Sequence, residues 1–230
     1  MPSLARVRAA VLAALFVAIA LGWARRAGDA MAATAAVPPA AAPWWVSKRS
    51  PLNVYGAKVA WGWTTVLFAA ALALCAPARP PRSSAVALAR YALATAYWVA
   101  MTRWCFGPPL FDRVFVRTGG SCLGPPALPA VASLHLCKQA GGRWSGGHDI
   151  SGHCFLLLHS AMFLVGDVLA PLLAARPHTA PHRAAAAAAV ALLALWGFML
   201  YVTARHFHGA PELLSGVAAG AGYWTGVALL

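Results

Sequence analysis

Six apolar segments, separated by charged residues and by Pro and Gly, constrain this chain more than any other feature of its sequence. A transmembrane helix needs about 20 predominantly apolar residues, and these segments are close to that length. The pattern therefore predicts an all-α membrane protein with six transmembrane helices in a single polytopic domain. The domain covers residues 1–230, and the predicted spans are approximately residues 7–23, 55–76, 85–101, 153–175, 184–203 and 213–230.

The composition supports a membrane protein and excludes several other classes. Hydrophobic residues make up 61% of the chain and charged residues 10%, whereas a soluble domain has roughly 25% charged residues. So small a charged share cannot cover a water-facing surface, which excludes an ordinary cytosolic enzyme and a disordered chain. The 5 cysteines are too few for a disulfide-dense secreted module.

The first apolar segment has a second interpretation. Arg6 and Arg8 precede it, and the small residues at 32–36 resemble the cleavage site of a signal peptide. We favour an uncleaved span, because these small residues lie well beyond the apolar stretch. In both cases the chain emerges on the same side of the membrane.

Counting the spans assigns the connecting loops to membrane faces. Loops 25–54, 102–152 and 204–212 share one face, so the start of the fourth span and the end of the fifth lie at the same surface. Loop 102–152, between the third and fourth spans, is the longest, and long connections are usually functional or disordered. Basic residues occur on both sides, so the positive-inside rule does not decide which face is cytosolic.

The net charge of +13 reflects 18 Lys and Arg against 5 Asp and Glu. In a membrane protein this excess indicates cytoplasmic anchors, attraction to anionic lipid, or a site for phosphate-bearing substrates. Because the basic residues are scattered between the spans, and do not form one patch, we expect no nucleic-acid partner.

Histidines gather at the shared surface. His148 and His153 lie at the mouth of the fourth span, and His206 and His208 lie at the exit of the fifth. Two imidazoles at one surface can supply a nucleophile and an acid without a metal. A metal site built from these histidines is disfavoured, because the sequence has no zinc-type spacing. The proposed chemistry therefore requires no cofactor.

The sequence Ser151-Gly152-His153 suits a phosphate group. Ser151 or Asp149 can cap the fourth helix, and Gly152 lets an anion approach the backbone N–H groups at the positive helix end. The alternative is an ordinary helix cap beside an interfacial histidine. Further positive charge can come from basic side chains elsewhere in the chain, namely Arg205, Arg143 and Lys58.

Two acidic residues and two cysteines complete the candidates. Glu212 lies four residues after His208 and can orient its imidazole, or it can simply begin the sixth span as a first-turn acid. Asp149 is the alternative orienting carboxylate. Cys122 and Cys137 share loop 102–152, where an oxidising compartment permits a disulfide.

Four stretches of the sequence resemble the fat storage-inducing transmembrane (FIT) family of the endoplasmic reticulum. The resemblance implies six spans, both termini in the cytosol, and an active site that faces the lumen. The family is related to lipid phosphate phosphatases, whose serine-glycine-histidine motif matches Ser151–His153 and whose second histidine matches His208. The four stretches are Leu52–Thr64, Thr118–Cys122, Asp149–Leu157 and Phe207–His208.

By this resemblance, His153 and His208 are the catalytic pair. His208 would attack phosphorus and His153 would protonate the leaving group, although a helix N-terminus disfavours an imidazolium at His153. The two roles therefore stay open. The lysine-to-arginine-proline motif of the phosphatases is absent, and their second motif is only partly present around Arg205, so the residues that hold phosphate also stay open.

The resemblance implies an acyl-CoA diphosphatase, which cleaves fatty acyl-CoA to acyl 4′-phosphopantetheine and adenosine 3′,5′-bisphosphate. Such an enzyme would support lipid-droplet formation and lipid balance in the endoplasmic reticulum. One alternative is a non-catalytic protein that binds diacylglycerol or triacylglycerol and partitions this neutral lipid into droplets. Another is a broader lipid phosphate phosphatase. The sequence predicts neither whether a divalent cation is required nor which oligomeric state the protein adopts.

Overall fold

The computed structural model describes residues 4–33, 43–78, 80–103, 108–124, 133–175 and 179–228, which form two compact units. The first unit contains Met1–Ala87 and Ser151–Leu230, and the second contains Leu88–Ile150. Helix α3 (Pro81–Thr102) begins in the first unit and ends in the second.

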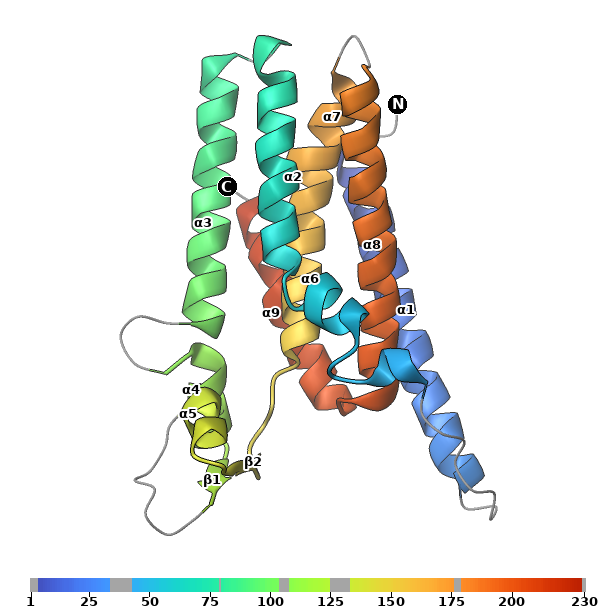
Figure 1. Cartoon of the computed structure of the whole chain (residues 1–230), viewed down its shortest axis with the longest axis vertical. Helices are drawn as coiled ribbons and strands as arrows, with labels where there is room; N and C mark the ends of the chain where they lie inside the picture. The colour runs from blue at the N-terminus through green and yellow to red at the C-terminus, as the bar shows by residue number, and fades with distance from the viewer. Residues whose placement is uncertain are drawn as a thin grey trace. The chain divides into compact units, whose positions relative to one another are not determined.

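The first unit is helical (Figure 1). Its α-helices are α1 (Leu4–Ala33), α2 (Ala60–Cys75), α6 (Gly152–Phe163), α7 (Ala170–Ala174), α8 (Ala180–His206) and α9 (Ala210–Ala228). Shorter helical turns are η1 (Trp44–Val46), η2 (Leu52–Ala57), η3 (Ala76–Ala78) and η4 (Leu164–Leu169).

Three of the described helical segments are long and apolar enough to cross a membrane: Leu4–Gly28, Gly152–Ala174 and Ala180–His206. They coincide with the first, fourth and fifth predicted spans, so a mostly helical fold with three candidate membrane helices is confirmed, and the number of six spans stays a prediction. Helix α2 is apolar but shorter, and it begins at Ala60, several residues later than the second predicted span. Helix α1 is continuous to Ala33; residues 34–36 of the possible cleavage site lie outside the described residues.

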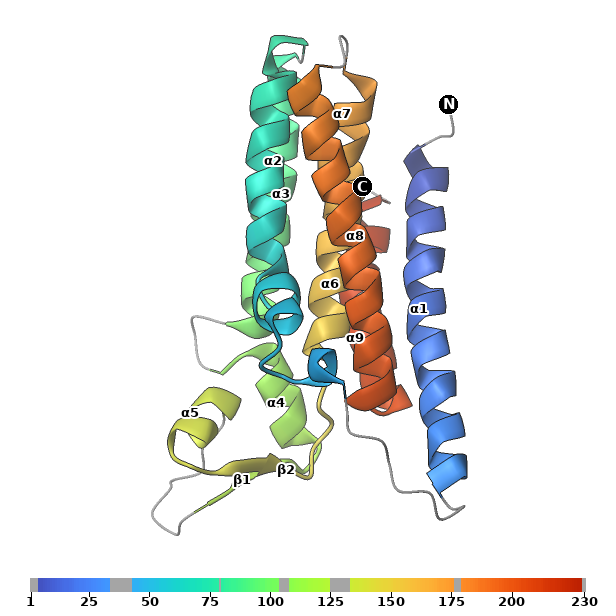
Figure 2. The same cartoon turned by 45° about the vertical axis from the view of Figure 1, so that its right-hand side comes forward.

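Small residues allow close helix packing within the first unit. A Cβ atom at Gly216 would lie 2.5 Å from the backbone oxygen of Ser151, and one at Gly220 would lie 2.6 Å from that of Phe155. Helix α9 therefore packs closely against the start of α6. Helix α1 lies along α8 in both views (Figures 1 and 2), where Gly22 faces the backbone of Tyr201.

A buried ion pair joins α1 to the fourth span. Arg8 Nη2 lies 3.8 Å from Asp167 Oδ2, and Asp167 is buried within η4. The π-helical turn η4 precedes Pro171, which has no N–H to continue the α-helical pattern. Asp167 thus faces a neighbouring helix.

The second unit gives structure to most of the predicted long loop. It contains α4 (Leu110–Arg117), β1 (Ser121–Leu123), α5 (Leu134–Gln139) and β2 (Arg143–Ser145). The strands pair antiparallel, with Cys122 opposite Trp144, so the fold is mostly helical and also contains a two-stranded sheet that the all-α prediction did not include. A disulfide between Cys122 and Cys137 ties β1 to α5. Three-residue strands have too little alternation to be recognised from sequence.

Candidate active site

His153 is held by a residue that lies a hundred positions earlier in the chain. Its Nε2 atom lies 2.7 Å from the side-chain oxygen Oδ1 of Asn53, which is buried in η2. The amide group Nδ2 of Asn53 donates to the carbonyl oxygen of Lys48 at 2.8 Å. Because that contact fixes the orientation of the amide, Oδ1 must accept and Nε2 of His153 must carry a hydrogen. Its Nδ1 atom makes no hydrogen bond within the described part of the chain, so this nitrogen is available for chemistry.

The turn η2 that carries Asn53 is fixed against α8. Trp196 donates from its indole nitrogen to the backbone oxygen of Gly56 at 3.3 Å. A Cβ atom at Gly56 would lie 2.9 Å from Cδ2 of Leu195, so glycine permits the close approach. Asn53 is therefore positioned by packed, buried contacts.

His208 is held by the acid at the start of α9. Its Nδ1 atom lies 3.1 Å from Oε2 of Glu212, and the same oxygen accepts a hydrogen bond from the Gly209 N–H at 3.0 Å. Glu212 thus both orients the imidazole and caps the first turn of α9, so the two interpretations of this residue are compatible. The guanidinium of Arg26 on α1 donates to the backbone oxygen of His208 at 2.6 Å. The Nε2 atom of His208 has no hydrogen-bond partner among the described residues.

The two histidines lie close enough to interact electrostatically. The Ser151 N–H donates to the carbonyl oxygen of Glu212 at 3.1 Å, which joins the residues before α6 to the start of α9. His153 interacts electrostatically with His208, Lys58 and Lys48. Among the described residues, each imidazole therefore has one nitrogen held by a side chain and the other without a hydrogen-bond partner, and His153 lies near the charges of Lys48 and Lys58.

The motif before His153 has the expected local structure. Ser151 is the N-cap of α6, and its hydroxyl accepts a hydrogen bond from the Cys154 N–H at 3.4 Å. Gly152 is exposed, and a Cβ atom there would meet nothing within 4 Å among the described residues. The backbone at this helix end is open to an approaching anion.

The predicted basic residues have different positions. Lys58 follows η2, and its Nζ atom donates to the carbonyl oxygen of Lys48 at 3.4 Å. Arg205 donates to the hydroxyl of Tyr201 at 3.0 Å near the end of α8. Arg143 lies on β2, and Asp149 interacts electrostatically with Asp112, so these two are described within the second unit.

Three residues near the histidines were not predicted from the sequence as site residues: Asn53, Lys48 and Arg26. Asn53 could have been recognised, because an amide in an apolar stretch that also contains Lys58 needs a polar partner. Nothing in the sequence distinguishes Lys48 or Arg26, since each lies among other basic residues of the same loop or helix end. Among the described residues, no three His, Cys, Asp or Glu side chains gather as they would around a metal ion.

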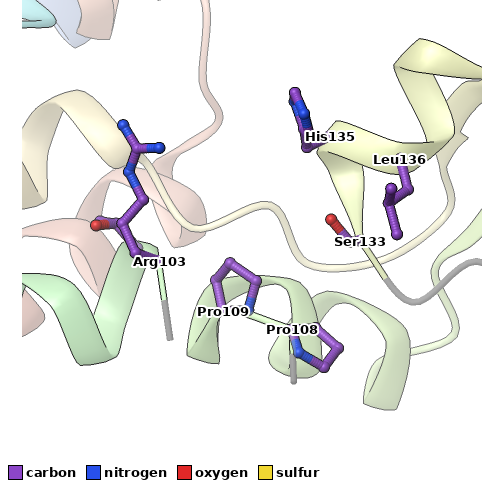
Figure 3. A pocket seen from close by; sticks show the side chains of 7 residues that line it. Arg103, Pro108, Pro109, Ser133, His135 and Leu136 are labelled. Atoms are coloured by element: carbon purple, nitrogen blue, oxygen red, sulfur yellow. The ribbon is translucent and has the colours of Figure 1, made fainter. Parts of the chain in front are cut away.

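A cavity of about 500 Å³ lies in the second unit (Figure 3). Arg103 and His135 flank it, and none of the predicted site residues lines it. Nearby, Asp112 accepts a hydrogen bond from the Leu134 N–H at 3.0 Å. Burial raises the pKa of the Asp112 carboxyl, although its hydrogen bonds to Leu134 and Ser133 oppose the rise.

Known proteins resemble the chain over most of its length. Residues 41–187 match the family of fat storage-inducing transmembrane proteins. The chain is 36% identical over 141 residues to acyl-coenzyme A diphosphatase fit1 of Schizosaccharomyces pombe, across 60% of this chain and 55% of that protein. It is 35% identical over 191 residues to acyl-coenzyme A diphosphatase FITM2 of Homo sapiens, across 78% of this chain and 70% of that protein. No solved structure matches.

The chain thus spans about half the length of the S. pombe relative and more than two thirds of the human one. The family match covers most of the segment in which the sequence motifs lie, from Asn53 to His153. The resemblance noted from those motifs is confirmed, and this chain belongs to the fat storage-inducing transmembrane family.

Proposed function

We propose that this chain is an acyl-CoA diphosphatase. It would hydrolyse the phosphoanhydride of fatty acyl-CoA to acyl 4′-phosphopantetheine and adenosine 3′,5′-bisphosphate. The observation that carries the proposal is the pair of imidazoles, in which Asn53 holds Nε2 of His153 and Glu212 holds Nδ1 of His208. The relatives of the chain in S. pombe and Homo sapiens, both named acyl-coenzyme A diphosphatase, support it as well.

His208 is the proposed nucleophile. Its Nδ1 hydrogen points to Glu212, which leaves the lone pair of Nε2 to attack one phosphorus atom of the anhydride. The bond from that phosphorus to the bridging oxygen breaks, and a phosphorus–nitrogen bond to His208 forms. The Glu212 carboxylate stabilises the positive charge that then develops on the ring.

His153 is the proposed acid and base. In its imidazolium form it gives the Nδ1 proton to the bridging oxygen as the other phosphoryl group leaves, while Nε2 stays bonded to Asn53. The neutral ring then takes a proton from a water molecule, which attacks the phosphorus and releases His208. A helix N-terminus disfavours an imidazolium, but a bound diphosphate offsets that effect with its own negative charge.

The residues around the two histidines suit a substrate with a charged head group and an apolar acyl chain. Lys58, Arg205 and the open backbone at Gly152 supply positive charge or N–H donors for phosphoryl oxygens. The catalytic pair lies at the ends of apolar helices α6 and α8, so the acyl chain can stay in the lipid while the head group reaches the histidines. Arg143 and Asp149 remain candidates for substrate binding and for orientation.

The proposed setting is the membrane of the endoplasmic reticulum. One polytopic domain would cross it six times, with both termini in the cytosol and the catalytic pair facing the lumen. A disulfide between Cys122 and Cys137 in loop 102–152 supports an oxidising compartment on that face. Activity there would sustain lipid-droplet formation and lipid balance, with neutral lipid as a second partner.

Identification of the products tests the proposal. Purified protein in lipid nanodiscs is incubated with oleoyl-CoA and, separately, with phosphatidate, and the products are identified by mass. We expect acyl 4′-phosphopantetheine and adenosine 3′,5′-bisphosphate from the first substrate. The variants His153→Ala and His208→Ala should lose this activity, and His135→Ala should keep it. Intact acyl-CoA with the wild-type protein would contradict the proposal, and release of inorganic phosphate from phosphatidate alone would favour a lipid phosphate phosphatase.

A further inference from the structure

We infer that Lys48 and Lys58 bind the two phosphoryl groups of a diphosphate separately, so that the site selects phosphoanhydrides over phosphate monoesters. The inference rests on the proposed function, because it assigns the two halves of that substrate to the two sides of the catalytic pair. It adds Lys48, which no sequence motif indicated, to the residues that bind substrate.

Lys48 lies against Phe207, the residue before His208. Its Nζ atom is 5.7 Å from the centre of the Phe207 ring, and Phe207 directly precedes His208. The lysine side chain is exposed, and no carboxylate of the described residues forms an ion pair with it. Its three N–H donors are therefore available to a ligand.

Lys58 lies on the His153 side. Its Nζ atom donates to the carbonyl oxygen of Lys48, and the same oxygen accepts from Nδ2 of Asn53. The opposite edge of the Asn53 amide holds His153. One short chain of contacts thus links the Lys58 ammonium to the proposed acid. Lys58, like Lys48, is exposed and has no carboxylate partner among the described residues.

The charges of the site are unbalanced without a ligand. Both ammonium groups interact electrostatically with His153, and among the described residues the acid at this place is Glu212, which contacts His208. Like charges gathered in this way repel each other, and an anion with more than one charge removes the repulsion. A diphosphate has two phosphorus atoms, each with its own charged oxygens, and so matches two ammonium groups.

The contacts of each lysine also indicate which phosphoryl group it stabilises. Lys48, beside Phe207 and so next in sequence to His208, stabilises the charge on the phosphoryl group that His208 attacks. Lys58, linked to His153 through Asn53, stabilises the phosphoryl group that leaves with the bridging oxygen. A phosphate monoester occupies one of these places and leaves the other lysine unpaired.

Binding of two small phosphonates tests the inference. Methylenediphosphonate and methylphosphonate are titrated into the protein in nanodiscs by calorimetry, with the variants Lys48→Gln, Lys58→Gln, Lys48→Arg and Arg49→Gln. Each Lys→Gln change should lower the affinity for methylenediphosphonate by roughly 10- to 100-fold, because one charge-assisted contact is lost. The same changes should lower the affinity for methylphosphonate by about twofold at most, because the second lysine still binds it. Lys48→Arg keeps the charge and should retain binding.

The control Arg49→Gln removes one exposed charge beside Lys48 and should leave both affinities unchanged. Equal losses for both phosphonates, or an unchanged affinity for methylenediphosphonate in Lys48→Gln, would overturn the inference, as would a wild-type protein that does not bind methylenediphosphonate. The titrations are repeated with the His208→Ala variant, because the binding measurement does not depend on catalysis. Lysine-dependent binding without acyl-CoA hydrolysis would therefore reject the proposed function alone, and hydrolysis without lysine-dependent binding would reject the inference alone.

Discussion

The Nε2 atom of His153 donates a hydrogen bond of 2.7 Å to Oδ1 of Asn53. The other edge of the same amide is bonded to the carbonyl oxygen of Lys48. One buried side chain therefore selects the tautomer of the proposed acid and anchors the loop that carries a positive charge to the site. This double role makes Asn53 the most informative residue to change outside the catalytic pair.

Replacing Asn53 with leucine keeps its approximate volume and removes both hydrogen bonds. We expect kcat for acyl-CoA to fall by roughly 10²-fold, since His153 loses its fixed orientation and the proton transfer that depends on it. KM should rise as well, because Lys48 loses its anchor. Steady-state kinetics measure both constants. Ser50→Ala removes a hydroxyl that accepts from the Asn53 backbone N–H and donates to the Trp45 carbonyl oxygen, and it should change kcat by less than about threefold. An equal loss in the two variants would contradict a specific role for the amide.

Changes at Glu212 separate orientation from charge. Both His208 and Gly209 contact the same carboxylate oxygen, Oε2, so glutamine can keep both contacts through its single carbonyl oxygen. We expect Glu212→Gln to lose less activity than Glu212→Ala, whose kcat should fall by about 10²- to 10⁴-fold because His208 is no longer held in the reactive tautomer. Steady-state kcat values for the two variants test this order. Thr225→Ala, on the same helix but distant in sequence, serves as the control and should retain wild-type kcat.

Two glycines on α9 provide a matched pair for the packing of the site. A Cβ atom at Gly216 would lie 2.5 Å from the Ser151 backbone oxygen, whereas one at Gly222 would meet nothing within 4 Å among the described residues. Gly216→Ala should lower the free energy of unfolding by about 1–3 kcal/mol and reduce kcat, because the start of α6 must shift. Gly222→Ala should be neutral or stabilise by up to about 1 kcal/mol. Thermal unfolding in detergent, with kcat measured in parallel, distinguishes them; equal behaviour would mean that α6 and α9 do not pack as described.

The buried carboxyl of Asp112 predicts a pH effect on the second unit. Its pKa is raised in the folded protein, chiefly by burial, so the folded state binds this proton more tightly than the unfolded state. The resulting stability is fully present below the unfolded-state pKa and is lost as the pH rises through the folded-state pKa. Asp112→Asn keeps an acceptor for the Leu134 N–H and removes the charge, so it should slow amide exchange of α5 at pH 7 and have little effect near pH 4. Arg117→Gln is the control and should leave the amide exchange rates of α5 unchanged. Exchange rates in Asp112→Asn equal to those of the wild type at pH 7 would contradict this account.

The sequence predicted the parts of the molecule whose signals are local. Apolar length located the helices around residues 153–175 and 184–203, and Ser151 was a recognisable helix cap. The pairing of His208 with Glu212 followed from a spacing of four residues. What could not be predicted depends on contacts between distant segments. The position of Asn53 against His153 results from the packing of η2 on α8, for which the sequence has no periodic signal.

The second unit shows the same limit. Loop 102–152 lacks the apolar length of a span, and its short helices and three-residue strands are held by the Cys122–Cys137 disulfide and by the stacking of Phe115 on Trp144. Such elements are stabilised by tertiary contacts more than by local propensity. Their existence therefore became evident only in the structure.

The most direct test of the central claim is a search for the covalent intermediate on His208. Wild-type protein is mixed with oleoyl-CoA, quenched within milliseconds and digested, and the peptide that contains His208 is analysed by mass spectrometry at neutral pH, where a phosphorus–nitrogen bond survives. We predict an adduct on His208 whose mass equals either the acyl phosphopantetheinyl group or the 3′-phosphoadenosyl phosphoryl group, and its absence in His208→Ala. An adduct on another residue, or turnover of acyl-CoA by His208→Ala at the wild-type rate, would contradict the account.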